Sequence, residues 1–541
     1  MQQLQQYEDT IDYLIQILEK LDAERQQLET QISRRHSITS VQRRVPVEIW
    51  ETIFLFACSG SSDDGYSLSM TMTPNLWSFA TTVSAFPIVL SHVCRRWRAI
   101  VNSCPTLWSS ISINGLRDFS TEHKILIETF LEKSAKCPLN LRAAEDWSGR
   151  TPSVMWELLK SHFLRRCGRL YLDLIGFSSL DNFEETDITF HHLLSLRLDS
   201  PIPGELNLNS PFWQAICHAP KLTQARISTL YPPNSLPYPQ LTTLVLDSVL
   251  LDHMEHLLRV LELCRNLRSF AFLQAYPDDG IPNSLDHIIR PVEMPSLRTL
   301  SLYSDSRLQR MNNPTIKVLC SSLVMTTLSA FSLACTSSYS EVTHWPSSLL
   351  SMLRRSSTTL RHMRLSLCPD FKSGWEAPLS VLLETTPNLT HLDLGEWFKD
   401  TIDEKRDYDE HEPPSILYSL VSSSIAVITS MNNLVPNLEY MSLVRVQLDS
   451  DILTKILTFA DSRSPSRLQS DVTSVASRSL KKIRVVPSEV EDSSEFVLEA
   501  HMLEEIRLLE RDGVKIVIEN STEEASSWPL RNVEGWDNLS E

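Results

Sequence analysis

The stretch MPSLRTLSL, residues 294 to 302, contains the phrase that decides the fold. Its last six residues follow the pattern L-x-x-Φ-x-Φ, where Φ is an apolar residue. Apolar residues at alternate positions are typical of a β-strand with one buried face. The same pattern recurs in LLSLRL (193–198), LTTLVL (241–246), LRSFAF (267–272), LSAFSL (328–333), LRHMRL (360–365), LTHLDL (389–394) and LEYMSL (438–443), with weaker copies in LTQARI (222–227) and LKKIRV (480–485).

The spacing of these phrases indicates a repeat array. In its most regular part the fourth residues of the phrases lie at 270, 300, 331, 363 and 392, which are steps of about 30 residues and close to the length of a leucine-rich repeat. Helical segments lie between phrases, such as LDHMEHLLRVLELC (251–264). One strand and one helix per repeat predict a curved α/β solenoid in which neighbouring repeats complete each other's core.

We expect this leucine-rich-repeat solenoid to span residues 164–520, to open with LRRCGRLYLDL (164–174) and to be followed by a polar tail at 521–541. The array is irregular, because the asparagine expected after the last leucine is replaced by Val249, Asp305 and Trp397 in three repeats. Two polar stretches, 398–415 and 462–479, are typical of solvated loops.

The residues between the core leucines are expected on the concave face of the solenoid. Tyr, Trp and Arg are common anchors of protein interfaces, so these positions are candidates for binding a target protein. The alternative is that each is an ordinary surface residue. The candidates are Arg197, Asp247, Tyr303, Arg364, His391, Asp393 and Trp397.

The N-terminal segment carries a heptad pattern from residue 4 to residue 32. Its a positions are Leu4, Ile11, Leu18, Arg25 and Ile32, and its d positions are Tyr7, Leu14, Leu21 and Leu28. The pattern predicts a coiled-coil helix over residues 1–38. Such a helix either pairs with a second copy of the chain or packs on the rest of its own chain.

Two helices are predicted between residues 41 and 113. The first follows Pro46, which suits the start of a helix, and runs to residue 58 with apolar residues on two neighbouring faces. The second follows Ser91 and carries Val93, Trp97 and Ile100 on one face, until Pro105 ends it. The intervening residues 59–87 are rich in Ser and Thr and indicate a loop, with a short helix near 76–79.

These two segments, VPVEIWETIF (45–54) and LSHVCRRWRAIVNSCPTLWSSI (90–111), resemble an F-box, the small helical module that binds the Skp-type adaptor of cullin–RING (SCF) ubiquitin ligases. The resemblance covers residues 41–113 and implies a small all-α module, joined by residues 114–163 to the solenoid. Val45 departs from the usual leucine, and the loop 59–87 is long. The resemblance implies adaptor contacts from Val45, Pro46, Ile49, Trp50, Ile53, Phe54, Leu90, Val93, Cys94, Trp97, Ile100, Leu107 and Trp108.

Composition argues against several other classes of function. The formal net charge of −17 disfavours a general nucleic-acid or anionic-membrane role. The ten cysteines include no C-x-x-C pair and are interpreted as free thiols of an intracellular protein, in the cytoplasm or nucleus. No phosphate-binding glycine motif, zinc motif or apolar run long enough to span a membrane occurs. We therefore expect no cofactor, no metal and no catalytic activity.

The sequence as a whole predicts the substrate-recognition subunit of an SCF-type ubiquitin ligase. The F-box would bind the adaptor, the leucine-rich repeats would bind a protein target, and catalysis would belong to an associated enzyme. Two alternatives come from other classes. In the first alternative, the chain is a leucine-rich-repeat scaffold whose F-box-like segment is only a folded cap. In the second, it is an enzyme with a polar pocket that the sequence does not reveal.

Overall fold

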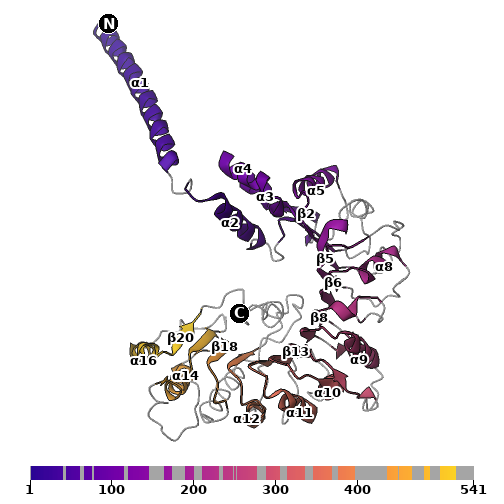
Figure 1. Ribbon diagram of the computed structural model, residues 1–541. Coiled ribbons are helices and arrows are strands. Elements are labelled where there is room, and N and C mark those ends of the chain that lie inside the picture. The colour runs from indigo at the N-terminus through magenta and orange to yellow at the C-terminus, as the bar shows by residue number, and fades with distance from the viewer. Residues whose placement is uncertain are drawn as a thin grey trace. The chain divides into compact units, whose positions relative to one another are not determined.

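The structure is a computed structural model of the whole chain (Figure 1). The chain divides into two compact units, residues 1–141 and 142–541. Each unit is described by itself below. The residues described are 2–39, 44–60, 66–75, 78–114, 120–144, 164–173, 189–199, 210–228, 230, 235–247, 249–250, 253–273, 275–276, 288–304, 314–335, 345–367, 376–396, 435–446, 448, 450–465, 480–487 and 500–519.

The first unit begins with a single long helix, α1 (Gln2–Thr39), as the heptad pattern predicts. The heptad side chains that the structure describes in full, other than Arg25, are Ile11, Leu14, Leu18, Leu21, Leu28 and Ile32, and each is more than half exposed. Arg25 lies 3.6 Å from Asp22 and 3.9 Å from Glu29 of the same helix. The apolar side of α1 is therefore not covered by the described part of the chain.

Four further helices follow in the first unit: α2 (Val47–Gly60), α3 (Phe86–Val93), α4 (Arg95–Ser103) and α5 (Thr121–Lys133). The helix predicted after Pro46 is confirmed. The single helix predicted after Ser91 is wrong, because the chain breaks at Cys94 into α3 and α4. Cys94 has an extended backbone, and its sulfur accepts a hydrogen bond from the Trp97 amide, so it caps the N-terminus of α4. A short 3-10 helix, η2 (Pro105–Trp108), follows α4.

A β-hairpin lies where a loop was expected between the two helical segments. Strands β1 (Leu68–Asn75) and β2 (Ser78–Ala85) pair antiparallel, and β1 also pairs in parallel with β3 (Ser110–Asn114). Leu68 and Met70 are buried and alternate with Ser69 and Thr71. The Ser and Thr residues therefore belong to a half-buried strand rather than to a loop, and the module is not all-α. The predicted short helix falls on β2 and on residues 76–77, which lie outside the described part.

The second unit is an α/β solenoid, and the coarse fold prediction is confirmed. After β4 (Leu139–Ala144), at the boundary of the units, its main sheet runs in chain order with parallel pairing from β5 onward. These strands are β5 (Cys167–Asp173), β6 (Ser195–Asp199), β7 (Gln224–Ile227), β8 (Thr243–Leu246), β10 (Ser269–Phe272), β13 (Thr299–Ser304), β15 (Ala330–Cys335), β16 (His362–Leu367), β17 (His391–Glu396), β18 (Tyr440–Val446), β19 (Lys482–Pro487) and β20 (Lys515–Ile518).

Helices connect most of these strands and lie along the outer, convex side of the arc in Figure 1, while the strands line its inner, concave side. Two short strand pairs, β9 (Val249–Leu250) with β11 (Ala275–Tyr276) and β12 (Val292–Glu293) with β14 (Leu323–Val324), lie beside the main sheet. The helices are α8 (Pro211–Cys217), α9 (Met254–Leu263), α10 (Pro314–Ser322), α11 (Ser347–Ser356), α12 (Glu376–Glu384), α14 (Ser450–Ser462) and α16 (Ala500–Arg511), with 3-10 turns η4 (Leu164–Arg166) and η5 (Tyr238–Gln240).

The register of the sheet explains the repeated phrase. The fourth residue of one phrase pairs with the fourth residue of the next, as Phe270 does with Leu300 and Leu300 with Phe331. These apolar residues are fully buried and form the core. The third and fifth residues of each phrase alternate with them and therefore lie on the concave face.

No helix in the described ranges is long and apolar enough to cross a membrane. The described cysteines for which a state is given are free thiols, and several are deeply buried. Burial raises the pKa of Cys264 and of Cys320 to about 12.

Candidate functional site

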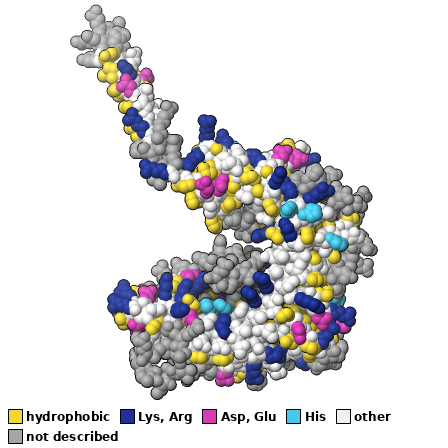
Figure 2. Space-filling model, viewed as in Figure 1, with side chains coloured by type: hydrophobic (Ala, Val, Ile, Leu, Met, Phe, Trp, Pro, Cys, Tyr) yellow, Lys and Arg dark blue, Asp and Glu magenta, His cyan; other side chains and the backbone are white. Residues whose placement is uncertain are grey.

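Two surfaces carry the side chains that the sequence singled out, one on each unit. On the first unit, helix α2 separates its apolar residues into two faces. Trp50 and Phe54 point inward and are 9% and 1% exposed. We call the exposed side formed by Ile49, Ile53 and Phe56 the outer face of α2. Its side chains are 51%, 45% and 72% exposed, and Figure 2 shows hydrophobic side chains gathered over this helix.

An aromatic cluster packs on the buried side of α2, away from the outer face. The ring centroids of Trp50 and Trp97 lie 5.2 Å apart, and those of Phe54 and Trp97 lie 4.9 Å apart in an edge-to-face arrangement. Such pairs stabilise beyond the area they bury. Trp97 joins α4 to α2 in this way, so the helix that carries the outer face is fixed by aromatic packing on its other side.

Trp108, the second tryptophan of the segment 90–111, has a purely internal position. It is 1% exposed, its indole nitrogen donates a 2.9 Å hydrogen bond to the Val101 carbonyl oxygen, and its ring lies 4.9 Å from that of Phe130. A residue that is enclosed in this way contributes to folding rather than to contact with a partner.

The arginines of this module hold its backbone. Arg96 donates a 2.7 Å hydrogen bond to the Val45 carbonyl oxygen, and Arg98 donates a 2.9 Å hydrogen bond to the Ser91 carbonyl oxygen. The first bond joins α4 to the segment just before the start of α2, and the second joins α4 to the C-terminal part of α3. Of the three arginines clustered in α4, Arg95, Arg96 and Arg98, two therefore have structural contacts within the module. These contacts argue against a phosphate-binding site.

The residues expected to contact an adaptor consequently divide by exposure. Pro46, Ile49, Ile53, Val93 and Cys94 are exposed, whereas Val45, Leu90 and Trp97 are half-buried. Trp50, Phe54, Ile100, Leu107 and Trp108 are buried and can support a contact but not make most of it. Val47, Phe56 and Val89 are exposed and were missed. Helical periodicity points to Phe56 from Ile49 and to Val89 from Val93, but it does not point to Val47.

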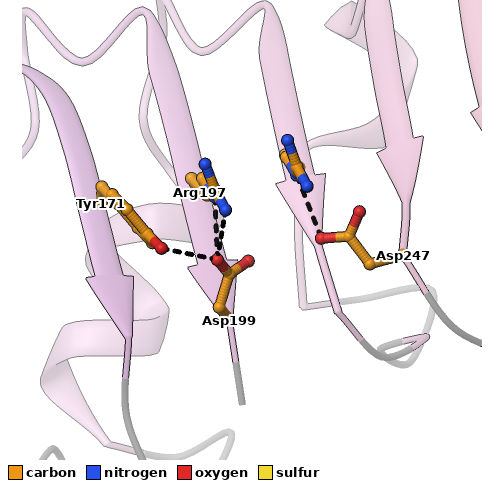
Figure 3. Close-up of polar contacts among 5 residues, drawn as sticks. Tyr171, Arg197, Asp199 and Asp247 are labelled. Atoms are coloured by element: carbon orange, nitrogen blue, oxygen red, sulfur yellow. Dashed lines mark hydrogen bonds and ion pairs between the residues drawn. The ribbon is translucent and has the colours of Figure 1, made fainter. Parts of the chain in front are cut away.

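On the second unit, a polar cluster occupies the N-terminal end of the concave face (Figure 3). The Tyr171 hydroxyl donates a 2.8 Å hydrogen bond to Asp199 Oδ2, and Arg197 forms a 2.7 Å ion pair with the same oxygen. On the next two strands, Arg226 forms a 3.0 Å ion pair with Asp247. The cluster thus combines two predicted residues, Arg197 and Asp247, with three that the prediction missed.

Burial controls the ionisation of this cluster. Burial, followed by the charge of Asp199, raises the pKa of Tyr171 well above its ordinary value. Burial also raises the pKa of Asp247, against the opposing effect of Arg226. Oδ1 of Asp199 and Oδ1 of Asp247 are buried and accept no hydrogen bond within the described chain. These two oxygens therefore lack a donor among the described residues and are closed off from solvent.

The middle of the concave face is apolar. Val245, Ala271 and Leu273 form a buried cluster, and the predicted residue Tyr303 packs against it. Tyr303 therefore lies at the border between an apolar patch and the polar residues that follow.

A second polar group lies toward the C-terminal end of the concave face. His362, His391 and Tyr440 stack on one another, with ring centroids 4.1 Å and 4.4 Å apart. Arg364, itself 6% exposed, donates hydrogen bonds of 3.0 and 3.2 Å to Asp393 Oδ2. The structure thus brings together Arg364, His391 and Asp393 of the predicted set, while Trp397 lies outside the described residues.

Arg484 also belongs to this group and forms a 2.6 Å ion pair with Glu519. His362, Tyr440 and Arg484 were missed by the sequence prediction. All three occupy the third or fifth position of a phrase, the same positions as His391 and Asp393. The repeated phrase therefore contains the information, because the third and fifth positions of each phrase predict which residues lie on the concave face.

Comparisons with known proteins show little. No protein-family model and no curated protein matches the chain. Among solved structures, the chain has a distant likeness to a protein from Bacteroides fragilis, with a TM-score of 0.28 and 9% sequence identity. The match covers 56% of this chain and 66% of the other.

Proposed function

We propose that this chain is the non-catalytic substrate-recognition subunit of an SCF-type cullin–RING ubiquitin ligase. In this proposal the first unit is an F-box that binds a Skp-type adaptor, and the second unit is an irregular leucine-rich-repeat solenoid that binds a protein target. The observation that carries the proposal is the outer face of α2, since Ile49, Ile53 and Phe56 remain exposed although Trp50 and Phe54 are buried.

If the F-box-like segment were only a folded cap, the apolar residues of α2 would be expected to be buried within the chain. Contiguous apolar patches exposed on soluble proteins mark interaction sites, and α3 adds Val89 and Val93, which are 62% and 58% exposed. The rival function, a scaffold whose F-box-like segment only closes the solenoid, requires a covered helix. The exposure of α2 therefore favours adaptor binding over the cap.

The proposed mechanism is proximity. The ligase holds its ubiquitin-conjugating enzyme near the adaptor, and a target held on the concave strand face is thereby kept at a high effective concentration near the transferred ubiquitin. This chain supplies binding surfaces and no reacting group. We accordingly place its action in the cytoplasm or nucleus, where such ligases act.

A homodimer through α1 also belongs to the proposal. The exposed heptad residues form one apolar seam along a 38-residue helix, and a second copy carries the same seam. Arg25, the charged residue at an a position, is already compensated by Asp22 and Glu29 of its own helix. A second copy therefore offers the seam an apolar surface of matching period and length.

The test is a pull-down of the full chain with purified Skp-type adaptor. The Ile49→Asp/Phe56→Asp variant removes two exposed apolar contacts and should reduce adaptor binding by at least about tenfold. Because both side chains are exposed, this variant should retain the wild-type circular dichroism spectrum.

The matched control is Ile125→Asp/Leu508→Asp, which makes the same change at side chains that are 58% and 51% exposed elsewhere. This control should bind the adaptor like the wild type. Absence of adaptor binding by the folded wild-type chain would contradict the proposal and support the scaffold.

A further inference from the structure

The C-terminal part of the concave face contains a row of five side chains placed by sheet register. His362 pairs with His391, His391 with Tyr440, Tyr440 with Lys482, and Lys482 with Lys515. We call these five residues the His–Tyr–Lys row. Successive strands are about 4.8 Å apart, so the row is roughly 19 Å long.

Stacking fixes the first three members. The His362 and His391 rings are 4.1 Å apart at an interplanar angle of 23°, and the His391 and Tyr440 rings are 4.4 Å apart at 14°. Rings stacked face to face in a row across a sheet present their edges outward. The edges of imidazole and phenol rings carry N–H and O–H groups, which are hydrogen-bond donors to an anion. Nδ1 of His391 already contacts the Thr390 hydroxyl at 2.9 Å, so Nε2 is the nitrogen of that ring that can serve an anion.

The two lysines give the row its positive charge. Lys482 lies directly opposite Lys515 on the next strand, and like charges in this position destabilise a sheet. No acidic side chain belongs to the row. Three acids beside the row act on its members, Asp393 on His362, Glu439 on His391 and Glu519 on Lys482. Each of these acids also forms an ion pair with a cation outside the row, Asp393 with Arg364 at 3.0 Å, Glu439 with Lys481 at 2.6 Å and Glu519 with Arg484 at 2.6 Å.

The row is therefore a local positive strip on a chain of net charge −17. Figure 2 shows histidine side chains with Lys and Arg side chains beside them, in the region where Figure 1 labels β18 and β20. Its length matches about six residues of extended peptide. An acidic peptide would offset the repulsion between Lys482 and Lys515 and would supply acceptors to the ring edges.

We propose that the His–Tyr–Lys row binds an acidic segment of about six residues, rich in Asp and Glu, in the protein target. The identity of the occupant as a target segment rests on the proposed function, whereas the binding itself requires no adaptor. Nucleic acid is the alternative anion, and the comparison of hexaglutamate with hexathymidylate below distinguishes the two.

The histidines give the interaction a characteristic pH dependence. Burial and the neighbouring imidazole, with a smaller effect of Arg361, lower the pKa of His362 to about 4 against the opposing charge of Asp393. Burial and Lys481 lower the pKa of His391 against the opposing charge of Glu439. Both rings are therefore neutral near pH 7. A bound carboxylate favours the protonated form, so binding takes up protons and becomes tighter as the pH falls.

The experiment measures binding of fluorescein-labelled hexaglutamate to the full chain by fluorescence anisotropy, without adaptor. We expect binding that is tighter at about pH 6 than at about pH 7.5. Lys482→Glu/Lys515→Glu should weaken it by roughly tenfold or more. The matched control Lys124→Glu/Lys221→Glu changes the total charge equally at two exposed lysines outside the row and should bind like the wild type.

Three results would overturn the inference. The first is no preference for hexaglutamate over an uncharged hexapeptide, and the second is an equal loss in both double variants, which would indicate only long-range charge. The third is tighter binding of hexathymidylate than of hexaglutamate. A variant that lacks residues 398–412 tests the chain's own acidic segment, since binding seen only after this deletion would assign the row to that segment instead. Failure of the adaptor pull-down leaves all these outcomes unchanged, so the two proposals fail separately.

Discussion

The rings of Trp50 and Trp97 lie 5.2 Å apart, and this contact joins the helix that carries the exposed apolar face to the helix that carries the clustered arginines. Phe54 completes the contact from one turn further along α2, 4.9 Å from Trp97. The buried residues on the inner side of α2 therefore hold the helix in place, and the exposed outer face depends on this packing. Stability and binding can be separated here, because they depend on neighbouring residues of one helix.

Phe54→Ala should unfold this module locally, whereas Ile53→Ala should not. Phe54 is 1% exposed, and truncating a buried phenylalanine costs about 3–5 kcal/mol. Ile53 is 45% exposed, and truncation at such a surface position costs about 0.5 kcal/mol or less. Hydrogen–deuterium exchange of the α2 amides measures both. Equal protection in the two variants would show that the aromatic cluster does not hold α2.

Asp393→Asn should destabilise the second unit through Arg364. Arg364 is almost fully buried, and burial lowers the pKa of its guanidinium while Asp393 raises it. Removal of the acid leaves a buried charge uncompensated, which costs roughly 3 kcal/mol. The control is Glu255→Gln, because the Arg259–Glu255 pair is exposed on both sides and such pairs contribute about 0.5 kcal/mol. Denaturant unfolding followed by circular dichroism gives both values, and a similar small loss in each would contradict this role of Asp393.

The second unit should lose stability as the solution is acidified below about pH 6.5. The pKa of His362 is about 4 in the folded chain, against an ordinary value of 6.5. Below the ordinary value the unfolded chain binds a proton that the folded chain does not, so unfolding becomes more favourable down to about pH 4. The effect of one group is at most about 1.4 kcal/mol per pH unit, and it vanishes above pH 6.5.

Unfolding midpoints measured across this range should show a weaker dependence on pH in His362→Phe, which keeps an aromatic ring in the stack. His253→Gln replaces an exposed histidine and serves as the control. An unchanged pH dependence in His362→Phe would mean that other groups cause the acid sensitivity.

The alternation of apolar residues predicts the solenoid because the phrase specifies burial directly. Leu300 and Leu302 are buried, and the residues between such leucines line the concave face, as the period of two requires. Which concave residues interact could not be predicted from one phrase alone. The stack of His391 on Tyr440 joins phrases that are 49 residues apart in sequence, and only the parallel register places them side by side.

The β-hairpin at 68–85 shows where composition misleads. Thr and Ser suit loops, but Thr is also a good strand former, and the buried pair Leu68 and Met70 decides between the two. The break at Cys94 has a similar origin. The apolar residues on both sides of Cys94 continue with helical spacing, so periodicity alone predicts one helix. In the structure the backbone of Cys94 is extended, and a new helix starts after it.

Leu18→Glu/Leu21→Glu should convert the chain from a dimer to a monomer. These side chains are 62% and 56% exposed in the single chain, and a dimer would bury them at adjacent a and d positions of the seam. Introduction of four carboxylates per dimer into that seam removes the apolar contact and adds repulsion. Multi-angle light scattering at about 10 μM, near the range in which short coiled coils associate, should show half the mass of the wild type. Gln16→Glu/Gln27→Glu adds the same charge on the opposite side of α1 and should remain dimeric, whereas a monomeric wild-type chain would refute pairing through this helix.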